Sequence, residues 1–475
     1  MIRRSSFLRA ALCSLVLCGP LAADDEASRI LHVQADGSGD HATIQGAIDA
    51  AEPGTTIRIG KGRFEESLTI SKPVTLEGAA WDQTRIVSTS ASNEELSPEV
   101  MQALARIAQE LDAETQAKLR EATVKVYASK PALAIRDTED VAIRNLSLLR
   151  SEPVRQGGFV SSGAVEIEDA GVTIEGCAVL ESPGTGIAAA GESHVSVRTC
   201  LIANSWGKGV AISVAEAGSF EIVDSEIRNN RYSGISIGSP SPEIRVQRCR
   251  INLTGWHGIR YDSSRPLIEG NSFQSTVVSG IYASGTTAAT VRNNLFLNSG
   301  MSCWFQCGDT IEANTFVGDR HEKLKTGIAQ GVQVLGASNP TIHRNIFVSC
   351  KNAVYTGDIG GDRPHSKASG TVQLVDNDFW DNERNLARYD AETEGMVSVP
   401  LPEGNRDEQP QFVDEEQKNF ALSPDSPFVE AGIGARDFAP VARIWPLQPE
   451  EERMAAPIMD RLFSIQPPAS DQDAR

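Results

Sequence analysis

The central part of the chain repeats one short phrase, and this repeat constrains the fold more than any other feature. Each copy alternates apolar with polar residues and ends in Cys, Ser or Asn. The copies are VTIEGC (172–177), VSVRTC (195–200), FEIVDS (220–225), IRVQRC (244–249), PLIEGN (266–271), ATVRNN (289–294), DTIEAN (309–314), PTIHRN (340–345) and VQLVDN (372–377). Successive copies end 20 to 32 residues apart, which is the period of a coiled β solenoid.

A second signal, a Gly followed by Ile or Val, comes about half a coil after most copies. It stands at Gly186-Ile187, Gly209-Val210, Gly234-Ile235, Gly258-Ile259, Gly280-Ile281 and Gly327-Ile328. Each coil therefore holds at least two strands, and a coil of about 23 residues has room for three short strands with their turns. The repeats predict an all-β solenoid.

The ends of the chain differ from this array. Residues 1–23 are typical of a secretory signal peptide, because Arg3, Arg4 and Arg9 precede a short apolar run at 11–18 and the small residues Ala22 and Ala23 suit a cleavage site. The run is too short to span a bilayer. We therefore expect a secreted or periplasmic protein without an integral membrane segment after signal removal. A repeat array grows by adding coils, so residues 24–440 are predicted to form a single domain. The Pro-rich, charged tail, 441–475, is predicted to lie along the surface or to be disordered.

The charge of the chain excludes one class of partner. The formal net charge is −19, and loss of the three arginines of the signal makes it −19 − 3 = −22. Nucleic acid binding depends on clustered Lys and Arg, so a nucleic acid partner is not expected. A local basic patch on an acidic body still allows a polyanionic sugar as a partner.

Six cysteines remain after the signal, and their positions argue against a general disulfide framework. Cys177, Cys200 and Cys249 occupy the repeat position that Asn takes in later coils, which predicts small buried groups stacked along the core. The segment CWFQC (303–307) lacks the second Cys or His pair of a zinc site, and a disulfide there would need a turn.

The amino-terminal region predicts a cap for the solenoid. Thr43 is a suitable N-cap for a helix whose apolar stripe is formed by Ile44, Ala47, Ile48 and Ala51. Such a helix covers the apolar core and strand edges of the first coil. The segments TTIRIG (55–60), SLTI (67–70) and VTLEG (74–78) follow as strands.

This region carries a family resemblance. DGSGDHATIQGAIDAA (36–51), GRFEE (62–66) and VTLEG resemble the amino-terminal part of pectin methylesterases, and more broadly the right-handed parallel β-helix proteins of the pectin-lyase type. The resemblance implies a three-sheet, right-handed solenoid with an amino-terminal capping helix. It also implies action on a polysaccharide.

A helical insertion interrupts the array at 92–122. Ser97 as N-cap, Pro98 at the first helical position and an apolar stripe through Leu104 and Leu111 indicate a helix. Two interpretations stay open: the insertion packs on the solenoid wall, or it forms a lid beside a groove.

Candidate site residues emerge when the repeats are aligned, because equivalent positions in successive coils lie about 4.8 Å apart. The turn before the Gly-Ile signal and the strand after it place aromatic and charged residues on one outer ridge. This predicted ridge contains Trp206, Lys208, Arg231, Tyr232, Trp256, His257, Arg260, Asp262 and Tyr282.

Such a ridge suits a saccharide. Aromatic faces stack on pyranose rings, and Arg or Lys binds a uronate carboxylate or a sulfate. If the site is catalytic, one basic group neutralises the carboxylate, and His257, Tyr282 or Lys208 moves the proton on C5. The catalytic candidates are therefore His257, Arg260, Tyr282 and Lys208. The binding candidates are Trp206, Arg231, Tyr232, Trp256 and Asp262. The alternative is that these side chains are solvated cover on the turns.

Two related activities are disfavoured by missing carboxylates. Where a pectin methylesterase resemblance implies an Asp after Cys177, the chain reads AVLESPGTG (178–186). SGISIGS (233–239) resembles the Gly-His-Gly segment of polygalacturonases, but Tyr232-Ser233 replaces Gly-His and no adjacent aspartate pair appears in the wall. Inverting hydrolysis requires two flanking carboxylates.

No metal site is predicted, because Glu166, Asp224, Asp262 and Asp309 fall on different coils and positions. The sequence indicates no particular cofactor. The first functional hypothesis is an exported lyase or epimerase acting on an acidic polysaccharide. The second is a non-catalytic carbohydrate-binding or surface scaffold, and the third is a pectinesterase-like hydrolase.

Overall fold

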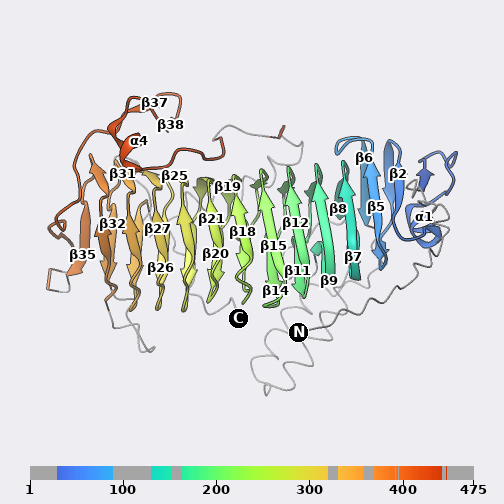
Figure 1. The fold of residues 1–475 in the computed structure, drawn as a ribbon, viewed down its shortest axis with the longest axis horizontal. Helices are drawn as coiled ribbons and strands as arrows, with labels where there is room; N and C mark the ends of the chain where they lie inside the picture. The colour runs from blue at the N-terminus through green and yellow to red at the C-terminus, as the bar shows by residue number, and fades with distance from the viewer. Residues whose placement is uncertain are drawn as a thin grey trace, which may run out of the picture.

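The computed structural model describes residues 29–88, 130–150, 163–318, 330–357, 369–390, 392–393, 395–440 and 445–446. The predicted signal peptide 1–23, the insertion 92–122 and all of the tail 441–475 except Trp445 and Pro446 lie outside these residues. Within them the chain winds into parallel coils stacked along one axis, from α1 and β2 at one end to β35 at the other (Figure 1). No helix in this part of the chain is long and apolar enough to cross a membrane.

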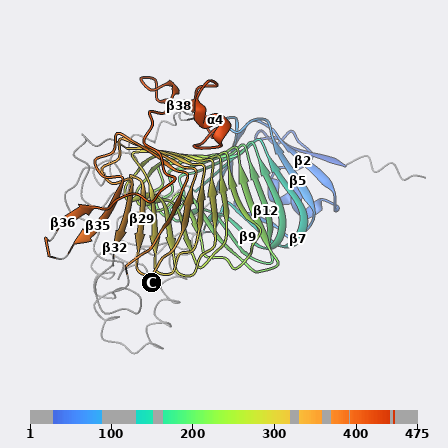
Figure 2. The same ribbon diagram turned by 60° about the vertical axis from the view of Figure 1, so that its left-hand side comes forward.

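Each coil contributes strands to three parallel faces, which confirms the predicted right-handed parallel β-helix. Face A consists of β4 (Leu68–Ile70), the first part of β7 (Leu133–Arg144) and of β9 (Gly163–Glu175), β11 (Thr185–Gly191), β14 (Val210–Val214), β17 (Ile235–Ile237), β20 (His257–Asp262), β23 (Ser279–Ser284), β26 (Met301–Trp304), β29 (Val332–Leu335), β32 (Val354–Gly357) and β35 (Leu386–Asp390). β36 (Gly395–Ser398) pairs antiparallel with β35 and closes this end (Figure 2).

Face B begins with strands that precede the first complete coil. It consists of β1 (Ile30–Val33), β2 (Thr55–Ile59), β5 (Val74–Gly78), the second part of β7 and of β9, β12 (His194–Arg198), β15 (Ser219–Val223), β18 (Ile244–Gln247), β21 (Leu267–Glu269), β24 (Thr290–Arg292), β27 (Thr310–Glu312), β30 (Thr341–His343) and β33 (Gln373–Val375). Faces A and B share one hydrogen-bonded sheet because β7 and β9 continue through the corner between them.

Face C is a separate sheet of short strands. It consists of β3 (Gly62–Glu65), β6 (Thr84–Ser88), β8 (Ser147–Arg150), β10 (Ala178–Leu180), β13 (Leu201–Ala203), β16 (Glu226–Arg228), β19 (Arg250–Thr254), β22 (Ser272–Thr276), β25 (Leu295–Leu297), β28 (Thr315–Val317), β31 (Ile346–Val348) and β34 (Asp378–Trp380).

The repeated phrase forms a strand of face B together with the corner that leads to face C. The residue before the final Cys, Ser or Asn has positive φ in successive coils, for example Thr199 (48°), Asp224 (51°) and Arg248 (49°). One left-handed residue reverses the chain within a tight corner and turns the next side chain inward. The corner is therefore built identically in each coil.

The inward residue of this corner forms a polar ladder along the core. Asn271, Asn294, Asn314, Asn345 and Asn377 are buried, and each side-chain amide donates to the carboxamide oxygen of the next Asn at 2.9 to 3.1 Å. In earlier coils Cys177, Cys200 and Cys249 take this position as buried, unpaired thiols, which confirms their predicted place. Each thiol contacts backbone carbonyl groups.

The rest of the core is apolar and regular. Phe273, Phe296, Phe316, Phe347 and Phe379 stack with ring centroids 4.5 to 5.0 Å apart. The Gly of the Gly-Ile signal is required by close packing between coils, because a Cβ at Gly258 would lie 2.5 Å from the carbonyl oxygen of Gly280. The two sequence signals thus mark positions where only a few side chains fit. The predicted signal Gly327-Ile328 lies outside the described residues, and Gly331-Val332 takes the signal position in that coil.

The predicted capping helix is α1 (Ile44–Ala50), and Thr43 is its N-cap. Thr43 accepts a hydrogen bond from Gly46 N at 3.1 Å, and the Glu66 carboxylate accepts from the amides of Ile44 and Gln45 at 2.9 Å. A carboxylate at this end stabilises the orphan amides and the positive end of the helix dipole. Ile44, Ala47 and Ile48 are buried, so the helix covers the first coil as expected.

The carboxyl-terminal segment folds back over face C. β37 (Phe412–Asp414) pairs with β38 (Asn419–Leu422), and α4 (Pro427–Ala431) follows, above β31 and β25 in Figure 1. Further along, the Ala435 amide donates to Thr315 and the Ala439 amide donates to Gly270 O.

The two described residues of the tail continue in the same direction on face C. Arg228 donates to the carbonyl groups of Trp445 and Pro446 at 3.0 and 2.7 Å, and the Trp445 ring packs edge-on against Trp81.

Candidate functional site

The predicted ridge lies on the outer surface of face A and on the turns that lead into it. Backbone hydrogen bonds stack these turns: Trp206 N donates to Ser182 O, Arg231 N donates to Ser205 O, and Val278 N donates to Trp256 O. Within the face, Arg260 and Tyr282 are direct neighbours in the parallel register of β20 and β23. Residues far apart in the sequence are therefore brought together at coil spacing.

Side chains of neighbouring coils contact one another through aromatic and cationic groups. The Arg231 guanidinium lies 4.6 Å from the Trp206 ring centroid. Tyr232 contacts Trp256 edge-on at 6.2 Å, and Arg260 lies between Trp256 and Tyr282 at 5.8 and 5.6 Å from their centroids. Cation–π contacts of this kind hold a guanidinium in a fixed orientation while leaving its edge available for an anion.

Two cations of this surface, Lys208 and Arg260, differ from the arginines of the neighbouring face B. Among the described residues, neither Lys208 nor Arg260 forms a salt bridge. The Lys208 side chain is exposed, yet partial removal of water from around its ammonium group and the nearby Arg260 charge lower the pKa of Lys208. Two like charges held this close favour an anionic ligand between them.

His257 lies beneath this surface. It is 4% exposed, its Nδ1 is 2.8 Å from Ser279 Oγ, and its ring stacks between Trp256 and Tyr282 at 5.4 and 4.6 Å. Burial, helped by the Arg260 charge, lowers the pKa of His257 to about 3. The ring is therefore neutral near pH 7 and packs as part of the aromatic stack.

Tyr282 and Asp262 occupy different depths. Tyr282 is 7% exposed, because Arg260, His257 and Trp304 surround its ring. Asp262 is exposed at the end of β20 and accepts a hydrogen bond from Ser263 Oγ at 2.9 Å.

Two aromatic residues that extend this surface are absent from the predicted ridge. The Trp304 ring lies 5.9 Å from Tyr282, and Phe305 lies 6.0 Å from Trp304. This coil carries Gly300-Met301 in place of Gly-Ile. The alignment used Gly followed by Ile or Val, so this coil was not included in the predicted ridge. Pairing of Ile281 with Met301 across β23 and β26 restores the register. We call the resulting surface the aromatic ridge: Trp206, Lys208, Arg231, Tyr232, Trp256, Arg260, Tyr282, Trp304 and Phe305.

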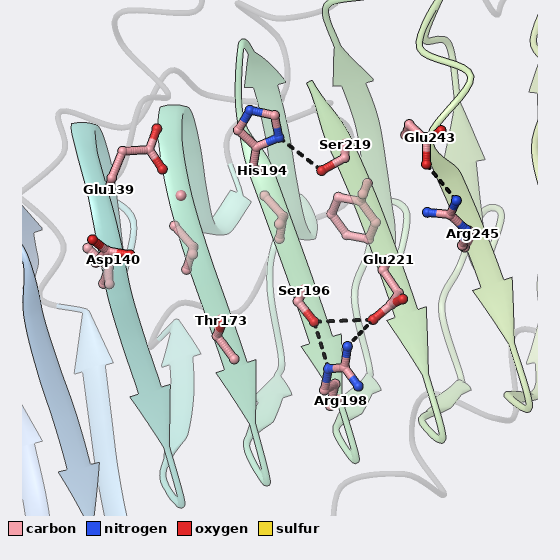
Figure 3. Close-up of a pocket in the computed structure, with 15 residues that line it drawn as sticks. Glu139, Asp140, Thr173, His194, Ser196, Arg198, Ser219, Glu221, Glu243 and Arg245 are labelled. Carbon is pink, nitrogen blue, oxygen red and sulfur yellow. Dashed lines mark hydrogen bonds and ion pairs between the residues drawn. The ribbon is translucent and has the colours of Figure 1, made fainter. Parts of the chain in front are cut away.

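A second concave surface lies on face B, between β7 and β18 (Figure 3). This groove has a volume of about 390 Å³. Its two arginines are paired within the wall: Arg198 contacts Ser196 and Glu221, and Arg245 contacts Glu243 at 2.5 Å. His194 Nδ1 is 3.0 Å from Ser219 Oγ. The groove is lined by more carboxylates than arginines and has few aromatic faces.

One cluster has donors suitable for a metal ion. Cys303, Cys307 and Asp309 are buried with their ligand atoms within 4.8 Å of one another, at the corner between faces A and B. This cluster was not predicted from the sequence. Asp309 was grouped there with carboxylates that were expected to point outward, rather than with the nearby cysteines.

Comparison with known families agrees with this architecture. The model of the right-handed β-helix region matches residues 132–296. The model of the periplasmic copper-binding protein NosD matches residues 240–396. No curated protein matches the chain.

Solved structures share the fold at low sequence identity. PfbA, a surface adhesin of Streptococcus pneumoniae, has 13% identity and a TM-score of 0.52, covering 77% of this chain and 95% of its own. The A-module of mannuronan C-5 epimerase AlgE6 of Azotobacter vinelandii has 15% identity and a TM-score of 0.45, covering 78% and 95%. A PL6 alginate lyase in complex with a trisaccharide has 12% identity and a TM-score of 0.45, covering 87% and 95%.

Proposed function

We propose that this right-handed parallel β-helix protein acts on an acidic polysaccharide, which it binds along the aromatic ridge. The observation that carries the proposal is the row of cations stacked on aromatic rings, with Arg260 held between Trp256 and Tyr282. An exported location follows from the predicted signal peptide. The match to a periplasmic family model supports that location.

The ridge fits a polymer better than a single sugar. Trp206, Tyr232, Trp256, Tyr282 and Trp304 come from five successive coils. Four steps of about 4.8 Å make a row of roughly 19 Å. A polymer lying along the solenoid axis meets an aromatic face or a cation at each step.

The chemistry of the ridge selects uronates or sulfated sugars over neutral ones. Aromatic rings provide apolar contact for the C–H face of a pyranose. The Arg260 guanidinium can donate two parallel hydrogen bonds to a carboxylate, and Lys208 adds a second positive charge. A neutral polymer would leave both cations unpaired and would bind more weakly.

A second, catalytic role is supported by the place of Lys208 on the ridge near Arg260, where burial and the Arg260 charge lower the pKa of Lys208. In a β-elimination, Arg260 binds the uronate carboxylate, and Lys208, after it has released its own proton to solvent, removes the C5 proton. The electron pair forms a C4–C5 double bond while the C4–O bond breaks, and the leaving oxygen takes a proton. In an epimerisation, removal of the C5 proton gives a carbanion, and a proton from solvent adds to the opposite face of C5. His257 supports Tyr282 and Trp256 from below in either case.

The test is a panel of purified polymers: polymannuronate, polyguluronate, polygalacturonate and a neutral glucan. Affinity is measured by calorimetry, cleavage by the ultraviolet absorbance of the unsaturated uronate, and epimerisation by the proton spectrum of the product. We expect Arg260→Ala to weaken uronate binding by about tenfold to 100-fold, and the matched face B variant Arg245→Ala to bind like wild type.

The same panel separates the two roles. Loss of product in Lys208→Met with affinity retained within a few fold supports catalysis. Binding without any product supports a non-catalytic scaffold. Failure to bind every uronate polymer, or equal binding of the neutral glucan, would overturn the proposal.

A further inference from the structure

The corner that follows β26 gathers two thiols and one carboxylate inside the protein. Cys303, Cys307 and Asp309 are each fully buried, and one ligand atom from each lies within 4.8 Å of the others. Cys307 Sγ is 3.1 Å from Asp309 Oδ2. In the described part of the chain, no other group of three or more Cys, His, Asp or Glu side chains comes this close together.

The local backbone explains how residues of the spacing Cys-x3-Cys-x-Asp converge. Cys303 is the inward residue of β26, in register with Ala283 and Val334. The chain then reverses through Phe305 and Gln306, whose φ values are 60° and 44°. Cys307 follows the reversal, and Asp309 directly precedes β27. This turn brings the second thiol back over the first.

Asp309 is unusual for its position. The hydrogen bonds from Thr290 N to Pro266 O and from Thr310 N to Ala289 O stack Pro266, Ala289 and Asp309 in successive coils. The two preceding coils thus have an apolar residue where this coil has a carboxylate. Burial of a charged carboxylate is unfavourable unless the carboxylate is paired, hydrogen-bonded or coordinates a metal.

We propose that Cys303, Cys307 and Asp309 bind a thiophilic metal ion, Zn²⁺ or Cu⁺, as a structural site. Thiolate ligands select these ions over Mg²⁺ and Ca²⁺. Binding releases the protons of the two thiols to solvent. Zn²⁺ would offset two of the three negative charges of the ligands and Cu⁺ one, and hydrogen bonds from Tyr261 and Ala289 to Asp309 stabilise the remaining charge.

The surroundings of the carboxylate support this assignment. Tyr261 Oη donates to Asp309 Oδ2 at 2.5 Å, and Ala289 N donates to Asp309 Oδ1 at 2.7 Å. Ligand carboxylates are usually oriented by such hydrogen bonds. The other buried thiols differ, since Cys177, Cys200 and Cys249 contact backbone carbonyl groups and no carboxylate.

The site also has a consequence for the molecular surface. Trp304 and Phe305 lie between the two cysteines, so ligation of Cys303 and Cys307 fixes the turn that presents these rings on the aromatic ridge. The metal site itself does not depend on the identity of the polysaccharide.

The experiment measures zinc and copper in the full exported protein by mass spectrometry, after loading with each ion and extensive dialysis. We expect about one ion per chain. Substitution with Co²⁺ should give a thiolate-to-cobalt absorption band. Both signals should disappear in Cys303→Ser and Asp309→Asn, and Tyr261→Phe should weaken binding about tenfold to 100-fold.

Matched controls separate ligation from folding and from polymer binding. Cys200→Ser removes a buried thiol outside the cluster and should retain the ion, as should Arg260→Ala. Circular dichroism verifies the fold of each variant. If Cys303→Ser does not fold, Asp309→Asn tests whether the ion is lost. The proposal is overturned if wild type takes up neither ion, if Cys303 and Cys307 form a disulfide, or if Asp309→Asn binds like wild type.

Discussion

Faces A and B are built from the same coils, yet their outer surfaces follow different chemical rules. On face B the register places Arg144, Glu175 and Arg198 in consecutive coils, so opposite charges alternate along the axis. On face A, Arg260 is in register with Ser236 and Tyr282, and its guanidinium contacts aromatic rings. The repeat sets the same spacing on both faces, and the outward side chains decide the difference.

This difference shows which features distinguish a binding surface from a surface that only stabilises the fold. Cross-strand pairs of opposite charge satisfy each other and contribute modestly to stability. Cations that stack on aromatic rings keep their hydrogen-bonding edges for a ligand. The groove of face B is concave, but its arginines, Arg198 and Arg245, already have carboxylate partners.

The sharpest test of this comparison is a pair of charge reversals. Arg260→Glu should reduce the affinity for a uronate polymer about 100-fold, because it removes one attraction and adds one repulsion. Arg245→Glu on face B should change affinity less than about threefold. Calorimetric titration measures both. Equal losses would mean that the overall charge, rather than the aromatic ridge, determines binding.

A pH test compares His257, which is buried beneath the aromatic ridge, with His194, which is exposed on face B. The pKa of His257 is about 3 in the folded protein, against about 6.5 when unfolded. Below pH 6.5 the unfolded state therefore binds a proton that the folded state does not, and stability falls as the pH decreases. Between pH 7 and 5 this contribution amounts to about 2 kcal/mol.

Denaturant unfolding at several pH values measures this effect. His257→Gln should flatten the dependence of unfolding free energy on pH. The control His194→Gln changes an exposed ring on face B and should leave the dependence as in wild type. An unchanged slope in His257→Gln would show that the ring is not held neutral by burial.

The length of the aromatic ridge can be tested at its far end. Trp304→Ala should weaken polymer binding about fivefold to tenfold, since one aromatic contact is lost. Tyr389→Ala removes an exposed aromatic side chain of β35 and serves as the control. Short oligosaccharides should be less sensitive to Trp304→Ala than the polymer. If both variants bind like wild type, the ridge ends before β26.

The smallest effect is expected on face B. Arg198 pairs with Glu221 at the surface, and exposed pairs contribute less than about 1 kcal/mol. Arg198→Ala should therefore lower the unfolding free energy by no more than this amount in denaturant titrations, without a change in polymer affinity. A loss of several kcal/mol of unfolding free energy would indicate that the alternating charges of face B hold the coils together.

Much of the fold was predictable because each coil repeats the same local requirements. The small residue of the Gly-Ile signal and the Cys, Ser or Asn of the corner recur in most coils of the array, so they are visible in the sequence. The capping helix was predictable from Thr43 and its apolar stripe. The strands β1 and β3 were not predicted, because they precede or interrupt the periodic pattern.

The candidate site was predictable only in part. Coil stacking correctly brought Tyr232, Trp256 and Arg260 together. The depth of His257 could not be predicted, because burial depends on the rings of the coils on either side. Trp304 was missed where Met301 replaces Ile, and the approach of Asp309 to Cys303 depends on a turn that no repeat encodes.

The return of the carboxyl-terminal segment across face C alters how the whole array can unfold. In a simple solenoid each coil interacts only with its neighbours, so the ends can fray independently. Here Ala435 contacts Thr315, Ala439 contacts Gly270, and Trp445 packs against Trp81. Coils that are remote from one another thus share one crossing segment. Detachment of that segment exposes apolar side chains on many coils at once, which makes loss of structure an all-or-none event rather than a progressive one.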